Sequence, residues 1–148
     1  MKFVDSYNSF VGVFVAILTA IFGQYWFLFF FFLLFNVIDW LTGWYKARQL
    51  KQESSKVGFK GLVKKLGYWA IIVVSFSISF CMIKIGDIIG LDLTITIFLG
   101  WFTLAALMIN EARSILENLV ESGYDVPSVL VKGLAVYEKM IDQKVDDK

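Results

Sequence analysis

Residues 25–44, YWFLFFFFLLFNVIDWLTGW, decide the class of fold, because such a run would be hard to keep soluble on any surface helix. Two further apolar stretches follow at residues 66–83 and 93–109. Each is close to the ~20 residues that an α-helix needs to cross ~30 Å of hydrocarbon. The sequence therefore predicts an all-α integral membrane protein with about three transmembrane helices.

The overall composition supports this class. The chain has 148 residues, of which 58% are hydrophobic and 18% are charged. A typical soluble domain is ~45–50% apolar and ~25% charged. The chain contains no histidine, the commonest general base and metal ligand, and its lone Cys81 excludes an internal disulfide. We therefore expect no enzymatic activity, no cofactor and no metal site.

Positive charge is concentrated between the first two apolar stretches. Seven basic residues face one acidic residue, Glu53, which gives a local net charge of +6 in a chain whose total is +1. Short loops rich in Lys and Arg stay in the cytoplasm, and such residues also attract anionic headgroups at ~1 kcal/mol each. The loop at residues 46–65 is thus predicted to be cytoplasmic. Its topology and headgroup candidates are Lys46, Arg48, Lys51, Lys56, Lys60, Lys64 and Lys65.

The predicted organisation has three parts. Residues 1–23 form a short interfacial or re-entrant helix, because the apolar run at 10–22 is short for a span. A single tilted helix over residues 10–38, or a tight pair of spans, remains the alternative. Residues 24–109 form the transmembrane domain. Residues 110–148 form a cytoplasmic helical tail whose five basic and eight acidic residues give it a net charge of −3.

Asp39 is the most informative polar residue, because a carboxylate at the centre of a span costs ~2.5–3.5 kcal/mol. Pairing with Lys64, Lys65 or Arg113 of a neighbouring helix is one interpretation, and lining a water-filled pore is the other. Glu111 lies just beyond the third stretch, so its side chain could reach the interface. The pore or helix-packing candidates are Asp39, Thr42, Gly43, Thr96, Gly100, Thr103, Glu111 and Arg113.

The third stretch offers one helix face of small residues. Thr96, Gly100 and Thr103 recur at spacings of four and three, so they share a face on which another helix can approach closely. We expect this face to be a helix–helix contact, with pore lining as the alternative. In the second stretch Ser75, Ser77 and Ser79 recur with period two, and we expect their hydroxyls to bond to their own helix backbone.

Three segments around these candidates resemble a known family. They are DWLTGWYKAR at residues 39–48, SSKVGFKGLVKK at 54–65 and NEARSILENLVESGYDVP at 110–127. Together they are similar to the phage holin family of the toxin-secretion and phage-lysis type, which includes lysis holins of Gram-positive phages and clostridial toxin-secretion holins. The resemblance extends over roughly residues 20–140.

The resemblance implies a function. Such holins accumulate in the bacterial cytoplasmic membrane, oligomerise, and open lesions through which a murein hydrolase or a protein toxin escapes. The implied partners are membrane lipids, further copies of the chain and a released cargo, and not nucleic acid. The alternative is a membrane adaptor or anchor that forms no pore and recruits a partner through its acidic tail.

Overall fold

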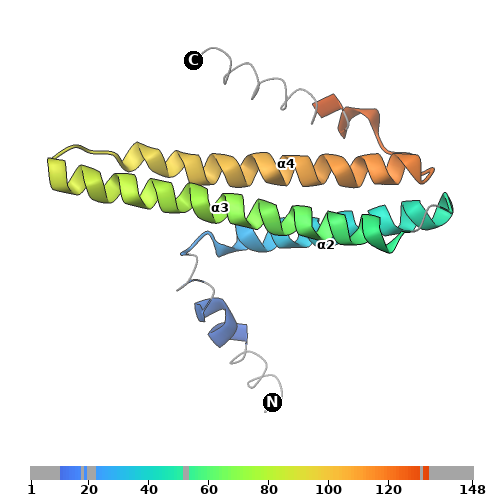
Figure 1. The fold of residues 1–148 in the computed structure, drawn as a ribbon, viewed down its shortest axis with the longest axis horizontal. Coiled ribbons are helices and arrows are strands. Elements are labelled where there is room, and N and C mark those ends of the chain that lie inside the picture. The colour runs from blue at the N-terminus through green and yellow to red at the C-terminus, as the bar shows by residue number, and fades with distance from the viewer. Residues whose placement is uncertain (1–10, 18, 20–22, 52–53, 131, 134–148) are drawn as a thin grey trace. The chain divides into compact units, whose positions relative to one another are not determined.

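The computed structural model describes residues 11–17, 19, 23–51, 54–130 and 132–133. Within these ranges the chain forms helices, turns and no strand. The long helices are α2 (Trp26–Gln49), α3 (Ser55–Ile89) and α4 (Ile97–Glu121), and a short 3-10 helix, η1 (Thr94–Thr96), precedes α4 (Figure 1). The predicted all-α class is confirmed.

Three segments are long and apolar enough to cross a membrane. They are Trp26–Gln49, Gly58–Ile89 and Thr94–Glu121. These segments confirm the predicted three membrane-spanning helices among the described residues. The helices continue past the apolar runs, because the polar residues at their ends also favour helix and the headgroup region is wet.

The chain divides into two compact units, residues 1–34 and 35–148. In the first unit, residues 11–17 are helical and Gly23, at φ +73°, precedes α2. This agrees with a short N-terminal helix, but residues 1–10, 18 and 20–22 lie outside the described part. An interfacial or re-entrant position for this helix stays a prediction.

The second unit is built on a hairpin of α3 and α4, which run antiparallel and side by side (Figure 1). The helix α3 ends where Gly90 adopts φ +73° and its N–H donates to the Gly86 carbonyl, a conformation that favours glycine. Lys84 and Asp87 lie beyond the apolar stretch at residues 66–83 but still belong to α3, because Gly86 does not end the helix and Gly90 does. The two side chains form an ion pair at 3.0 Å.

The two helices of the hairpin touch through small and hydroxyl side chains. A Cβ on Gly100 would lie 2.5 Å from the Phe76 ring, so only glycine admits that ring at this distance. Thr103 donates to the Ser75 hydroxyl at 3.0 Å, and the fully buried Ser79 donates to the Thr96 carbonyl at 2.7 Å. Close approach and interhelical hydrogen bonds are the usual means of helix association in lipid.

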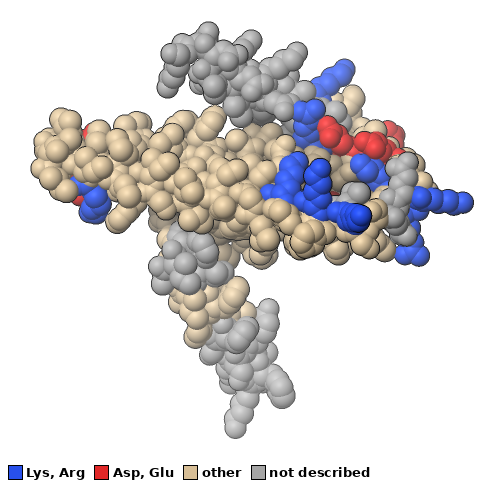
Figure 2. All heavy atoms as spheres, in the orientation of Figure 1, with Lys and Arg blue, Asp and Glu red and all other residues tan. Residues whose placement is uncertain are grey.

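Few apolar side chains are hidden in the second unit. Ile72 and Leu104 are buried between the helices, whereas Val73, Phe80 and Phe98 are about 60% exposed. Figure 2 shows a middle without charged side chains along α3 and α4, with charged side chains gathered where α3 begins and α4 ends and a small second group at the α3–α4 connection. Lipid tails solvate such apolar surfaces well.

The end of α4 is also marked by a glycine. The helix stops at Glu121, and Gly123 takes φ +85° in the turn that follows. Helix resumes at residue 128, directly after Pro127. Most of the predicted amphipathic tail, from residue 134 onward, lies outside the described residues.

Candidate functional site

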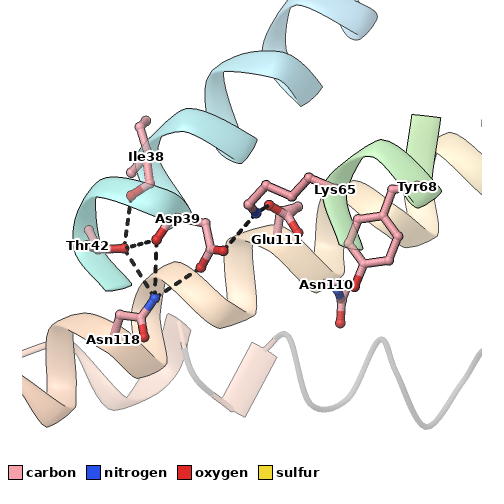
Figure 3. A network of polar contacts seen from close by, with 8 residues as sticks. All are labelled: Ile38, Asp39, Thr42, Lys65, Tyr68, Asn110, Glu111 and Asn118. Carbon is pink, nitrogen blue, oxygen red and sulfur yellow. Dashed lines mark hydrogen bonds and ion pairs between the residues drawn. The ribbon is translucent and has the colours of Figure 1, made fainter. Parts of the chain in front are cut away.

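A charged cluster joins all three long helices inside the second unit. The Lys65 ammonium on α3 lies 2.8 Å from the Asp39 carboxylate on α2 and also donates to the Glu111 carboxylate on α4 (Figure 3). The three side chains are only 11%, 16% and 3% exposed. Buried charges persist in proteins when they are paired, as these are.

Amide and hydroxyl groups extend the cluster along α2. The Asn118 side-chain amide donates to the second Asp39 carboxylate oxygen at 3.0 Å and to the Thr42 hydroxyl at 3.3 Å. The Thr42 hydroxyl in turn donates to the Ile38 carbonyl at 2.9 Å. A Cβ on Gly43 would lie 3.5 Å from the Asn118 amide nitrogen, which is an ordinary van der Waals contact, so an alanine would also fit at this position.

Helical periodicity explains why these residues meet. Asp39 and Thr42 are three residues apart on α2, and Glu111 and Asn118 are seven apart on α4, so each pair shares one face. Lys65 lies in the third turn of α3 and reaches both faces with its long stem. Two carboxylates share one ammonium, which leaves the cluster with a formal charge of −1.

The structure places the predicted candidates in two groups. Asp39, Thr42, Gly43 and Glu111 gather at the cluster, whereas Thr96, Gly100 and Thr103 lie at the α3–α4 contact. Among the three partners suggested for Asp39, the structure has Lys65. Arg113 instead pairs with Glu117 at 2.8 Å, and Lys64 lies 5.5 Å from the Tyr68 ring.

The side chain of Glu111 is turned inward. The residue is only 2% exposed, and its carboxylate is bound to Lys65. The physical reason is that Glu111 faces α3, where the Lys65 ammonium compensates its buried charge.

Sequence reasoning missed several polar contacts. Asn118 was not among the predicted site residues, and neither the Asn110–Tyr68 hydrogen bond at 3.1 Å nor the Lys46–Glu121 ion pair at 3.4 Å was expected. The seven-residue spacing of Glu111 and Asn118 was a usable signal. So was the spacing of Ser75 and Ser79, which are four apart and share a face, although the three serines were judged as a period-two run.

The remaining basic residues lie around the same end of the second unit. Arg48 lies 5.3 Å from the Trp44 ring, and Lys51 is exposed in the turn after α2 at φ +54°. Lys56, Lys60 and Lys64 are exposed on α3 at spacings of four, so they form one row. A role for these residues in topology or headgroup binding stays a prediction.

An open pocket of about 340 Å³ lies beside the charged cluster. Asp39 of α2 contributes to its wall, together with the first turns of α3 and the last turns of α4. The lining residues are Asp39, Gly61, Lys64, Lys65, Asn110, Glu111, Arg113, Ser114 and Glu117. In the described part of the chain, no group of three or more Cys, Asp or Glu side chains could hold a metal ion. The arrangement therefore offers ionic and hydrogen-bonding chemistry.

Comparison with known proteins identifies relatives over most of the chain. The profile described as the bacteriophage holin family matches residues 16–139. A probable holin of Bacillus phage phi105 is 32% identical over 114 residues, which cover 77% of this chain and 76% of that protein. An uncharacterized protein of Listeria monocytogenes is 33% identical over 70% of this chain and 66% of its own length. An uncharacterized protein of Bacillus subtilis is 29% identical over 75% of this chain and 71% of its own. No solved structure matches.

Proposed function

Because the chain belongs to the bacteriophage holin family, we propose that it oligomerises in the bacterial cytoplasmic membrane and forms pores or lesions. These openings release a murein hydrolase, which lyses the host, or a protein toxin. The observation that carries the proposal is the family match over residues 16–139, a range that includes all three candidate spans. Family membership favours a membrane protein without enzymatic activity.

The distribution of polarity gives the proposal a physical basis. In the second unit the outward surface of α3 and α4 is apolar, while Ser79, Glu111 and Asn118 are buried. A dispersed chain is therefore well solvated by lipid. Once copies associate, a rearrangement that exposes these polar groups to water costs little free energy. Water then replaces the hydrogen bonds that the groups made within the protein.

We place the C-terminal segment on the cytoplasmic side. The basic loop and the end of α4 lie together, since Lys65 contacts Glu111 and Lys46 contacts Glu121. The same end of the second unit carries the row of Lys56, Lys60 and Lys64. The positive-inside rule assigns that end to the cytoplasm, and α4 then delivers the tail to the same side.

Expression in a bacterium tests pore formation. We expect the membrane potential, followed with a voltage-sensitive dye, to collapse once the chain accumulates in the membrane fraction. An unrelated three-span protein expressed at the same level controls for overloading of the membrane. A potential that persists despite full membrane insertion would contradict the proposal. Co-expression with a murein hydrolase that lacks a secretion signal then tests release, which requires both proteins.

Removal of residues 123–148 separates a holin from an adaptor. A holin should keep most of its ability to depolarise the membrane, because the three spans and the charged cluster all lie before Gly123. An adaptor that recruits a partner through its acidic tail should lose its activity with the same truncation. Full activity of the truncated chain would therefore eliminate the adaptor.

A further inference from the structure

The pocket beside the charged cluster has an unusual lining for its position. It carries three basic residues (Lys64, Lys65 and Arg113) and three acidic ones (Asp39, Glu111 and Glu117). A pocket of about 340 Å³ lies at the low end of the ~300–1,000 Å³ range of small-molecule sites. It is therefore large enough for a small polar group but not for a protein segment.

The basic residues of the lining differ in whether they already pair with a carboxylate. Lys65 is paired with both Asp39 and Glu111, and Arg113 is paired with Glu117. Lys64 is exposed and, among the described residues, forms no ion pair with a carboxylate. Its ammonium is thus the group in this pocket best able to take an external anion.

The surroundings of the pocket raise the positive potential at its mouth. Lys60 and Lys56 follow Lys64 toward the start of α3 at spacings of four, and both are exposed. The pocket lies where the apolar middle of α3 and α4 gives way to their charged end (Figure 2). In a bilayer this junction is the level of the phosphate groups.

We propose that this pocket, between Gly61 and Lys64 of α3 and Arg113 and Ser114 of α4, binds the phosphodiester headgroup of an anionic phospholipid. The Lys64 ammonium and the Arg113 guanidinium pair with the phosphate oxygens, and the Ser114 hydroxyl donates to one of them. The lining carboxylates accept hydrogen bonds from headgroup hydroxyls. The proposal requires the chain to lie in a membrane but not to open a pore, so it survives or fails independently of the proposed function.

Two glycines of α3 provide a matched test of the pocket. A Cβ on Gly61 or on Gly58 meets nothing within 4 Å, so a side chain can start at either position without a backbone clash. Only Gly61 lines the pocket. Gly61→Phe should therefore occupy it, whereas Gly58→Phe adds the same apolar surface one turn earlier and leaves the pocket open.

The binding experiment uses the full-length chain in an uncharged detergent, with bound lipid counted by native mass spectrometry. Phosphatidylglycerol is the probe. We expect Gly61→Phe and Lys64→Gln each to weaken its retention about fivefold or more, the effect of one lost charge contact. Gly58→Phe and Lys56→Gln, which removes an equal charge outside the pocket, should stay within about twofold of wild type. Thermal unfolding of each variant verifies its fold.

Each other outcome overturns the proposal. Equal losses for Lys64→Gln and Lys56→Gln would mean diffuse attraction of lipid to the lysine row. Unchanged binding by folded Gly61→Phe would place the lipid elsewhere. Equal retention of phosphatidylethanolamine would remove the preference for an anionic headgroup. Inorganic phosphate or glycerol phosphate that binds as tightly as the lipid would make this a site for a soluble phosphate.

Discussion

Lys65 links polar side chains of all three long helices. Its ammonium is shared by Asp39 and Glu111, so one side chain neutralises charge from two other helices. The sequence indicated a costly carboxylate at Asp39 and named Lys65 among three partners. It could not select among them, because the choice depends on the rotation of α3 and α4 about their axes, which only packing determines.

Lys65→Met tests the importance of this ammonium. The substitution keeps the volume of the stem but leaves two buried carboxylates without a counter-charge. Removing one partner of a buried pair costs ~3–5 kcal/mol, so we expect a clear fall in the midpoint of thermal unfolding in detergent. Lys60→Met, on an exposed position of the same helix, should change it little. Equal midpoints for the two variants would contradict the buried pairing.

At the scale of elements, the α3–α4 hairpin is held by close backbone approach. The spacing of Thr96, Gly100 and Thr103 pointed to this face from sequence alone, because small residues three and four apart share one side of a helix. The partner residues on α3 could not be identified in the same way. Phe76 is a large side chain, and nothing in its type indicates that a glycine of another helix would receive its ring.

Gly100→Ala probes that approach. A Cβ would lie 2.5 Å from the Phe76 ring, which packs edge-on against Trp101 with centroids 5.1 Å apart, so the ring must shift. Overpacking of this kind costs ~1–3 kcal/mol. Gly67→Ala on α3, where a Cβ meets nothing, should instead stabilise the helix by ~1 kcal/mol. Unfolding midpoints in detergent distinguish the two, and adding Phe76→Leu to Gly100→Ala should recover part of the loss.

The connection between α3 and α4 has a titratable cap. The hydroxyl and the backbone N–H of Thr94 both donate to the Asp92 carboxylate, and these bonds hold the pKa of Asp92 below its usual range. A lowered pKa in the folded chain means that the cap contributes stability above the unfolded pKa. This contribution is lost as the pH falls through the folded pKa.

The Asp92 cap can be followed by NMR titration of its carboxyl carbon. We expect a midpoint below that of an unstructured aspartate, and Thr94→Val should raise it, because the hydroxyl donor is then lost and the backbone donor remains. A midpoint that Thr94→Val leaves unchanged would show that the hydroxyl bond does not form in solution.

At the scale of the whole molecule, sequence and structure agree best on the membrane-spanning helices. Three long helices, their order and the polar segments between them follow from runs of apolar residues that only a bilayer can solvate. The ends of the helices were less predictable. The helix α3 has 35 residues, about 52 Å at 1.5 Å per residue, and thus exceeds the ~30 Å hydrocarbon layer at one or both ends.

The predicted topology can be tested by labelling with a membrane-impermeant maleimide. In a Cys81→Ser background, a cysteine at Asp87 should react in intact cells, because that end of α3 faces outward in the proposed orientation. A cysteine at Lys60 should react only after the membrane is permeabilised. Pore opening is kept low by sampling early after induction. The reverse pattern would invert the assigned orientation.

Two carboxylates, those of Asp39 and Glu111, share the ammonium of Lys65. The three positions should therefore tolerate substitution unequally. Replacement of Asp39 by Asn, or of Glu111 by Gln, still leaves a neutral pair with Lys65, and the amide can keep a hydrogen bond. Loss of Lys65 leaves both carboxylates without a counter-charge. A saturation survey of the chain should therefore find amides permitted at either acid, uncharged residues rejected at the base, and revertants of a lysine loss that carry changes at both acids.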